Sequence, residues 1–243
     1  MITLYLWQLR WRLLLVALVM LVLYAYEPGF HLHDAAGAEL DPLVTDPRGV
    51  GFTLANLSAA SMLVLLAGFV STDRRRGYYR IYFSHVTRPL GFYLLRWTVA
   101  YALSLLAALA FLVVGQLAAW GELRAGLGVM VQPAVFALVY GGMVAFFSVV
   151  LPKGDSFAAL AAYAVTSLWE YTISVFAEME RQPISPALRD AISLVLPPHV
   201  ALRHFFDVTL AGGSAWGDVA FAGGYGLFWL ILAGLLLWLR EWP

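Results

Sequence analysis

Residues 92–118 read FYLLRWTVAYALSLLAALAFLVVGQLA, and Arg96 is the only charged residue among these 27 positions. An α-helix of this length extends for about 40 Å, whereas the hydrocarbon core of a bilayer is roughly 30 Å thick. An apolar stretch of more than about 18 residues with so few charges is typical of a transmembrane helix. This segment therefore predicts a membrane protein.

The composition of the whole chain agrees with that prediction. Of its 243 residues, 62% are hydrophobic and 12% are charged, whereas soluble domains average about 45–50% apolar and about 25% charged residues. So few charges cannot cover a water-facing surface, which argues against a soluble enzyme and against a disordered chain. Fifteen basic and fifteen acidic residues cancel, so no nucleic-acid partner is expected. The absence of cysteine excludes disulfides, thiolate metal sites and cysteine catalysis.

Further apolar runs lie on both sides of this segment. The six expected spans are residues 13–26, 51–71, 92–118, 129–151, 157–177 and 219–239. The first run is short for a span, but the arginines and tryptophans before it would extend it into the interface. A signal peptide is the alternative for that run. Because no internal repeat or linker is found, we expect one all-α, polytopic transmembrane domain over residues 1–243.

Residues 178–218 separate the fifth and sixth spans and predict two short helices. Ser185-Pro186 is typical of an N-cap followed by the first helical residue. Apolar residues then fall on one helical face as far as Val195, and Pro197-Pro198 ends that helix. A second helix is expected at about His199–Leu210. Both are too short to span, so we expect them to lie in the outer membrane interface.

Arginine and lysine in the connections predict the orientation. Nine of them lie on the side that holds both chain ends, and five lie on the side that holds residues 178–218. Because positively charged loops stay in the cytoplasm, we expect both termini to be cytoplasmic and residues 178–218 to be outside. Lys153 is the only lysine in the chain. This bias is typical of GC-rich bacterial genomes, so we expect the inner (plasma) membrane of a bacterium.

Residues 73–88, between the second and third spans, form the densest charge cluster in the chain. Positive-inside topology and attraction to anionic lipid explain its arginines. They do not explain the aromatic residues among them, because arginines mixed with aromatics are typical of protein interfaces. The segment therefore predicts a protein-docking surface, with the candidate residues Asp73, Arg75, Arg76, Gly77, Tyr78, Tyr79, Tyr82 and Arg88.

Glu170 is the one acidic residue well inside an expected span. A charge at that depth costs a few kcal/mol, so such acids usually face a pathway or a partner. Glu170 is therefore a candidate for a substrate pathway or for a seam between subunits. The alternative is that it lies near the outer headgroups, or that it is protonated and hydrogen-bonded.

Catalytic motifs find little support in the chain. ATP hydrolysis needs a Gly-x-x-x-x-Gly-Lys-Ser/Thr loop, and Lys153 lies outside such a frame. An intramembrane serine protease needs a nucleophile beside a base. Ser214 lies in an expected loop, and none of the expected spans contains a histidine. We therefore expect no catalytic residues in this chain.

Histidine also suggests no strong metal site. His31, His33 and Asp34 could bind zinc, but their position in a long polar loop favours a solvated loop. His199 and His204 are five residues apart, a poor helical spacing for shared ligation. We expect both to be polar residues at the membrane interface.

The order of these features resembles the membrane subunit of an ABC-2 type transporter. The resemblance rests on six spans with a cytoplasmic N-terminus, and on Asp73, Gly77, Thr87-Arg88 and Arg96 in and after the charged segment. It also rests on Leu196-Pro197-Pro198 and the short helix before the last span. The pattern is loose and extends over essentially the whole chain.

The resemblance implies a membrane-spanning exporter subunit that works with a separate ATP-binding cassette subunit. That partner would bind ATP and magnesium, and this chain would need no cofactor. Residues 73–88 would form the coupling helix, which transmits nucleotide-driven motion to the spans. The remaining partners would be membrane lipid and either a second copy of the chain or a related permease.

Two other classes of function stay open: an intramembrane enzyme, and a membrane assembly protein that transports nothing. The near absence of polar groups in the expected spans argues against the enzyme. Two copies are expected to pack together, because one six-span bundle leaves no room for a large cargo. Gly141 and Gly142 are small residues that would let helix backbones approach closely.

Overall fold

The computed structural model describes residues 2–26, 47–78, 89–123, 127–178, 185–210 and 212–239. Within these ranges the chain is helical and contains no strand. The elements are α1 (Ile2–Tyr26), α3 (Pro47–Leu65), α4 (Ser71–Arg75), α6 (Pro89–Trp120), the 3-10 helix η2 (Leu127–Met130), α7 (Val131–Val150), α8 (Asp155–Glu178), α9 (Pro186–Val195), α10 (His199–Leu210) and α11 (Trp216–Leu239).

Within the described ranges, four helical segments are long and apolar enough to cross a membrane. They are Leu6–Ala25, Pro89–Ala118, Gly128–Val150 and Trp216–Leu239. α3 falls short because its apolar part covers only Val50–Leu65. α8 is long enough, but it carries three acidic residues and is less apolar. The structure therefore shows an all-helical chain with four candidate membrane-spanning helices.

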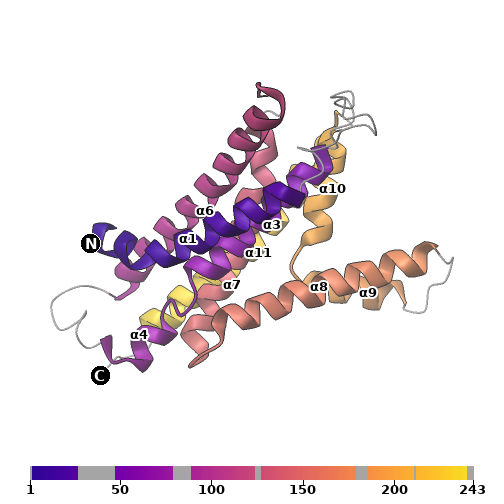
Figure 1. The fold of residues 1–243 in the computed structure, drawn as a ribbon. Coiled ribbons are helices and arrows are strands. Elements are labelled where there is room, and N and C mark those ends of the chain that lie inside the picture. Colours follow the sequence, from indigo (N-terminus) through magenta and orange to yellow (C-terminus); the bar gives the residue numbers. More distant parts are fainter. Residues whose placement is uncertain are drawn as a thin grey trace.

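The long helices run back and forth, so that their ends meet near α4. Arg12 in α1 donates a hydrogen bond to the Leu65 carbonyl at the end of α3, at 2.7 Å. Arg74 in α4 donates to the Val149 carbonyl at the end of α7, at 2.8 Å. Figure 1 shows both marked ends of the chain at this α4 end of the bundle and α10 at the opposite end.

α7 lies at the centre of the bundle and packs against α3, α6, α8 and α11. A Cβ added to Gly142 would overlap the Gly226 carbonyl oxygen of α11, and one added to Gly141 would overlap the Met62 side chain of α3. Small residues permit such close approach between helix backbones. The expectation that Gly141 and Gly142 let helices approach closely is confirmed, and the approach they permit is between helices of the same chain.

Several element boundaries differ from those expected. α1 extends eleven residues further toward the N-terminus than the expected run at 13–26, because the helix continues through the arginines and tryptophans before it. α3 ends at Leu65 instead of continuing to 71. Gly68, with φ +69°, lies in the turn that follows, and this left-handed conformation interrupts the helix.

The two helices expected between residues 178 and 218 are confirmed as α9 and α10. The Ser185 side chain accepts a hydrogen bond from the Leu188 N–H at 3.4 Å, and Pro186 is the first helical residue. No α9 residue is buried. Figure 1 shows α8 diverging from the rest of the bundle, with α9 and α10 on the side toward which it extends.

Candidate functional site

The first candidate site is the α4 junction, which we define as α4, the turn at 66–70 before it, and the side chains that hold them. The backbone N–H of Gly68 donates to both carboxylate oxygens of Asp155, at 3.1 and 3.0 Å. The Ser71 hydroxyl donates to the same carboxylate at 3.1 Å. Asp155 begins α8 and is buried. The start of α8 is thereby joined to the turn between α3 and α4.

α7 holds the same turn through its last residues. The Ser148 hydroxyl oxygen accepts from the N–H groups of Val70 and Ser71, at 2.7 and 3.1 Å. The Arg74 guanidinium donates to the carbonyls of Val149 and Leu151, at 2.8 and 3.3 Å. These bonds satisfy the free donors at the start of α4 and the free acceptors at the end of α7, which neither helix satisfies internally.

Asp73 joins α4 to α6. Its carboxylate forms an ion pair with Arg96 and accepts a hydrogen bond from the Tyr93 hydroxyl at 3.3 Å. The side chains of Asp73 and Arg96 are 9% and 13% exposed. The Arg96 guanidinium also lies 5.5 Å from the centre of the Phe92 ring, a distance at which the ring face attracts a cation. The pair is thus shielded from water and held on several sides.

The last residue of α4 and the three residues after it are exposed. Arg75, Arg76, Gly77 and Tyr78 are all exposed, Tyr78 to 40%. The predicted docking residues are thus divided by the structure, because Asp73 is buried and these four are exposed. The other three, Tyr79, Tyr82 and Arg88, lie outside the described residues.

The sequence did not reveal Ser148 and Asp155, which hold α4 and the turn before it from α7 and α8. Ser148 and Asp155 are an ordinary polar residue at the end of one expected span and an acid in an expected turn. An acidic residue in the first turn stabilises a helix through the helix dipole. This local effect is enough to explain an aspartate at position 155. Its contacts with Gly68 and Ser71 arise only when α8 packs beside α3.

The second candidate site surrounds Glu170, on α8. Glu170 Oε2 accepts a hydrogen bond from the Arg203 guanidinium of α10 at 3.0 Å. The Nδ1 atom of His199 lies 3.7 Å from the other oxygen, Oε1. The Glu170 side chain is 10% exposed, and Oε1 has no hydrogen-bond partner among the described residues. One oxygen of the carboxylate is therefore paired and the other is not.

His199 is buried, which corrects the expectation that it sits at the interface. Its Nε2 lies 2.6 Å from the Tyr140 hydroxyl of α7, and its ring stacks on Phe136 with centroids 5.0 Å apart. Burial, together with the positive charge of Arg203, lowers the pKa of His199 from 6.5 to about 4. His199 is therefore neutral at pH 7. If Tyr140 donates to Nε2, the ring proton lies on Nδ1 and faces Glu170.

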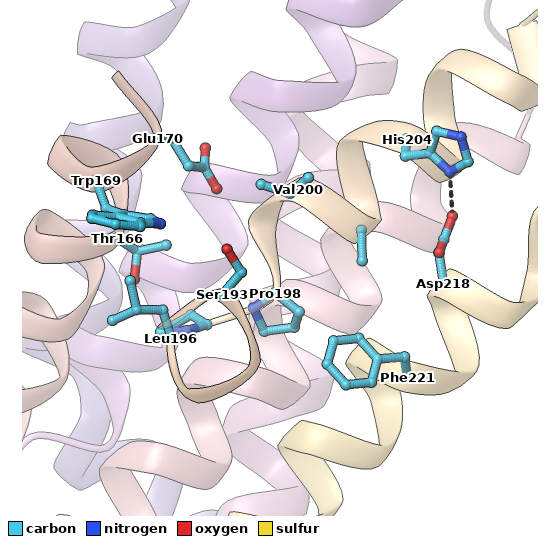
Figure 2. Close-up of a pocket in the computed structure, with 12 residues that line it drawn as sticks. Thr166, Trp169, Glu170, Ser193, Leu196, Pro198, Val200, His204, Asp218 and Phe221 are labelled. Atoms are coloured by element: carbon cyan, nitrogen blue, oxygen red, sulfur yellow. Dashed lines mark hydrogen bonds and ion pairs between the residues drawn. The ribbon is translucent and has the colours of Figure 1, made fainter. Parts of the chain in front are cut away.

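A cavity of about 310 Å³ lies beside Glu170, between α8, the α9–α10 connection and α11. Figure 2 shows the residues that line it. Its polar lining consists of Glu170, Thr166, Ser193, His204 and Asp218. His204 Nδ1 lies 2.7 Å from Asp218 Oδ2. Most of the remaining lining is apolar, from Trp169, Leu196, Pro197, Pro198, Val200 and Phe221.

The sequence indicated Glu170 but not the residues around it. Arg203, His199 and Asp218 come from α10 and α11, which are 29 residues or more away along the chain. The one available signal was general, because an acid in an apolar helix requires a partner. Choosing Arg203 as that partner requires the position of α10 against α8.

Comparisons with known proteins add no relative. No family model, no curated protein and no solved structure matches this chain. The proposals below therefore rest on the sequence and on the two candidate sites.

Proposed function

We propose that this chain is the membrane-spanning subunit of an ABC-2 type exporter. A separate ATP-binding subunit hydrolyses ATP, and this chain moves a substrate across the bacterial inner membrane. It acts with a second copy of itself or with a related permease. The observation that carries the proposal is the α4 junction, in which one short segment is bonded to several long helices and is exposed at its C-terminal end.

A segment that transmits motion between subunits needs a rigid connection to the helices that move. α4 has such connections to α6 through Asp73 and Arg96, and to α7 through Ser148. Asp155 adds a connection to α8. A loop that served only to hold positive charge in the cytoplasm would need none of these bonds. The exposed arginines and Tyr78 supply the types of residue that anchor protein interfaces.

The proposal includes six spans, with α3 and α8 as the second and fifth. α8 is less apolar than α1, α6, α7 and α11, and its Glu170 lies beside the cavity between α8 and α11. Polar groups in a span suit a helix that borders a pathway better than one surrounded by lipid. Both chain ends and α4 are cytoplasmic in this proposal, as the distribution of arginine indicates.

The intramembrane enzyme finds less support in the cavity. His204 and Asp218 resemble two members of a serine-hydrolase triad, but no hydrogen bond joins Ser193 to His204 among the described contacts. His199 Nε2 is already engaged by Tyr140. The described residues thus show a base without a nucleophile bonded to it. The assembly-protein alternative differs from the exporter in lacking an ATP-binding partner.

Co-purification tests the proposed function directly. The tagged chain is extracted from its native membrane in mild detergent, and the proteins that remain bound are identified by mass spectrometry. We expect an ATP-binding cassette subunit in near-stoichiometric amount, and vanadate-sensitive ATP hydrolysis by the complex. A preparation that holds other membrane proteins but no ATP-binding subunit would favour the assembly protein and refute the exporter.

A further inference from the structure

The Glu170 carboxylate lines the cavity and has one oxygen without a hydrogen-bond partner among the described residues. Glu170 Oε2 is bonded to Arg203, whereas Oε1 is buried with no hydrogen-bond partner among the described residues. A buried, unpaired carboxylate oxygen is costly, because its desolvation is not compensated. A donor from outside the protein would remove this cost.

We propose that this cavity binds a small amphiphilic primary amine, whose ammonium group pairs with the Glu170 carboxylate and whose apolar body lies against Trp169, Leu196 and Phe221. The interpretation of the bound amine as a cargo rests on the proposed export function. The binding of the amine to this cavity does not depend on that function.

The charges at the cavity select a cation. Two carboxylates line it, those of Glu170 and Asp218, and His204 is the only basic side chain in the lining. Arg203 is not part of the lining, and its side chain is 58% exposed. A charge-assisted hydrogen bond between an ammonium and a carboxylate is roughly twice as strong as one between neutral groups. An anion in the same place would meet two like charges.

The walls of the cavity select an apolar body of limited size. Leu196, Pro198, Val200 and Phe221 offer apolar surface, and Trp169 offers an aromatic face, to which cations are attracted. At roughly 30 Å³ for each water-sized group, the volume of about 310 Å³ holds about ten non-hydrogen atoms. This size fits an arylalkylamine, or the head and first carbons of an aminolipid.

Calorimetric titration of the full chain in lipid nanodiscs tests the proposal, with empty nanodiscs to subtract partitioning. The probes are 4-phenylbutylamine, its uncharged analogue 4-phenylbutanol and its anionic analogue 4-phenylbutyrate. We expect saturable binding of the amine, at least tenfold weaker binding of the alcohol, and no binding of the carboxylate. Equal binding of all three would show nonspecific uptake by an apolar cavity and would overturn the proposal.

Single substitutions test whether Glu170 is the residue that holds the amine. Glu170→Gln should weaken amine binding at least tenfold, whereas Glu122→Gln, in the exposed connection after α6, should leave it unchanged. Ser193→Phe should abolish binding by filling the cavity without changing its charge. Full-strength amine binding by Glu170→Gln or by Ser193→Phe would overturn the proposal.

A substitution of Arg203 distinguishes two roles for Glu170: to hold the amine, or only to form an ion pair with Arg203. If Glu170 holds the amine, Arg203→Gln removes the competing cation, and amine binding should strengthen several-fold. If Glu170 serves only to pair with Arg203, this variant should bind no better than wild type. Thermal unfolding identifies a variant that has lost its fold, and in that case Arg203→Met, which also removes the charge but keeps an unbranched apolar stem, replaces it. Unchanged or weaker binding by a folded Arg203→Gln variant would overturn the proposal.

The ammonium can belong to a lipid headgroup or to a soluble amine, and nanodisc composition distinguishes them. If phosphatidylethanolamine is the natural source, its presence in the nanodisc should compete with 4-phenylbutylamine and lower the apparent affinity relative to phosphatidylglycerol. An unchanged affinity assigns the site to soluble amines. Because these titrations use no ATP-binding subunit, their failure leaves the exporter proposal intact, and failure of co-purification leaves the amine site intact.

Discussion

Asp73 in α4 is buried against Arg96 in α6, so a segment with an exposed C-terminal end is tied to the longest helix in the structure by an ion pair shielded from water. Tyr93 donates to the same carboxylate. Pairs of this kind fix geometry more than they add stability, because desolvation offsets most of the attraction. Removal of one partner nevertheless destabilises the fold, since the remaining charge is then buried without its counter-charge.

Asp73→Ala should therefore destabilise the protein by about 3–5 kcal/mol, because it leaves Arg96 buried without its carboxylate. Thermal unfolding in nanodiscs measures the effect. The double variant Asp73→Ala with Arg96→Met should recover a large part of the loss, since it removes both charges. A double variant that is no more stable than Asp73→Ala would show that the ion pair is not what holds α4.

Tyr78→Ala with Tyr82→Ala should release the ATP-binding partner while the chain stays folded and inserted. Truncation of interface anchors of this type costs about 2 kcal/mol or more, which is roughly thirtyfold in affinity. Pull-down of the partner and the ATPase rate of the complex provide the measurements. Tyr171→Ala is the matched control, because Tyr171 is 67% exposed but lies on α8. Wild-type binding by the double variant would reduce the segment to a topological charge cluster.

Gly226→Ala and Gly223→Ala, both in α11, should change stability in opposite directions. A Cβ at Gly226 would lie 2.9 Å from backbone atoms of Leu138 and Val139, whereas a Cβ at Gly223 would meet nothing within 4 Å. Overpacking costs about 1–3 kcal/mol, and alanine in an open helical position gains about 0.5–1 kcal/mol over glycine. Melting temperatures of the two variants decide the matter. Equal stability of both would mean that α7 and α11 do not pack this closely.

Stability should fall as the pH drops from 6.5 toward 4, through His199. Burial lowers the pKa of His199 to about 4, so between these two values the unfolded chain binds a proton that the folded chain excludes. The free energy of unfolding then decreases with falling pH, by at most about 3 kcal/mol. Unfolding of wild type and His199→Gln, compared at pH 7.5 and 4.5, isolates this contribution. The variant should lose less stability than wild type, and an equal loss would contradict the buried, neutral imidazole.

Labelling of single cysteines should report the orientation without background, because the chain has no cysteine of its own. Ser214→Cys, before α11, should react with a membrane-impermeant maleimide on intact cells. Lys153→Cys, in the turn between α7 and α8, should react only after the membrane is opened. Both residues are exposed, so burial does not explain a failure to react. Reversed labelling would place α4 outside and remove its role in coupling.

The sequence by itself determined the all-helical fold class, with helices apolar enough to cross a membrane, and the position of most helices. A run such as 92–118 needs no tertiary information, because bilayer thickness and the rise of an α-helix decide how many apolar residues cross the membrane. Ser185 and Pro186 predicted the start of α9 correctly, since N-capping depends on residues three positions apart.

Only the tertiary structure decided where α3 ends and what α4 contacts. The N–H of Gly68 finds its acceptor on Asp155, 87 residues away, and that of Val70 finds Ser148, 78 residues away. In the same way, Glu170 Oε2 accepts a hydrogen bond from Arg203 because the fold brings that side chain of α10 to α8, and Oε1 is left without a hydrogen-bond partner among the described residues. Helix caps and apolar runs depend on residues that are close together in the sequence. The pairing of a buried polar group is decided by whichever distant residue the packed helices bring within hydrogen-bonding distance.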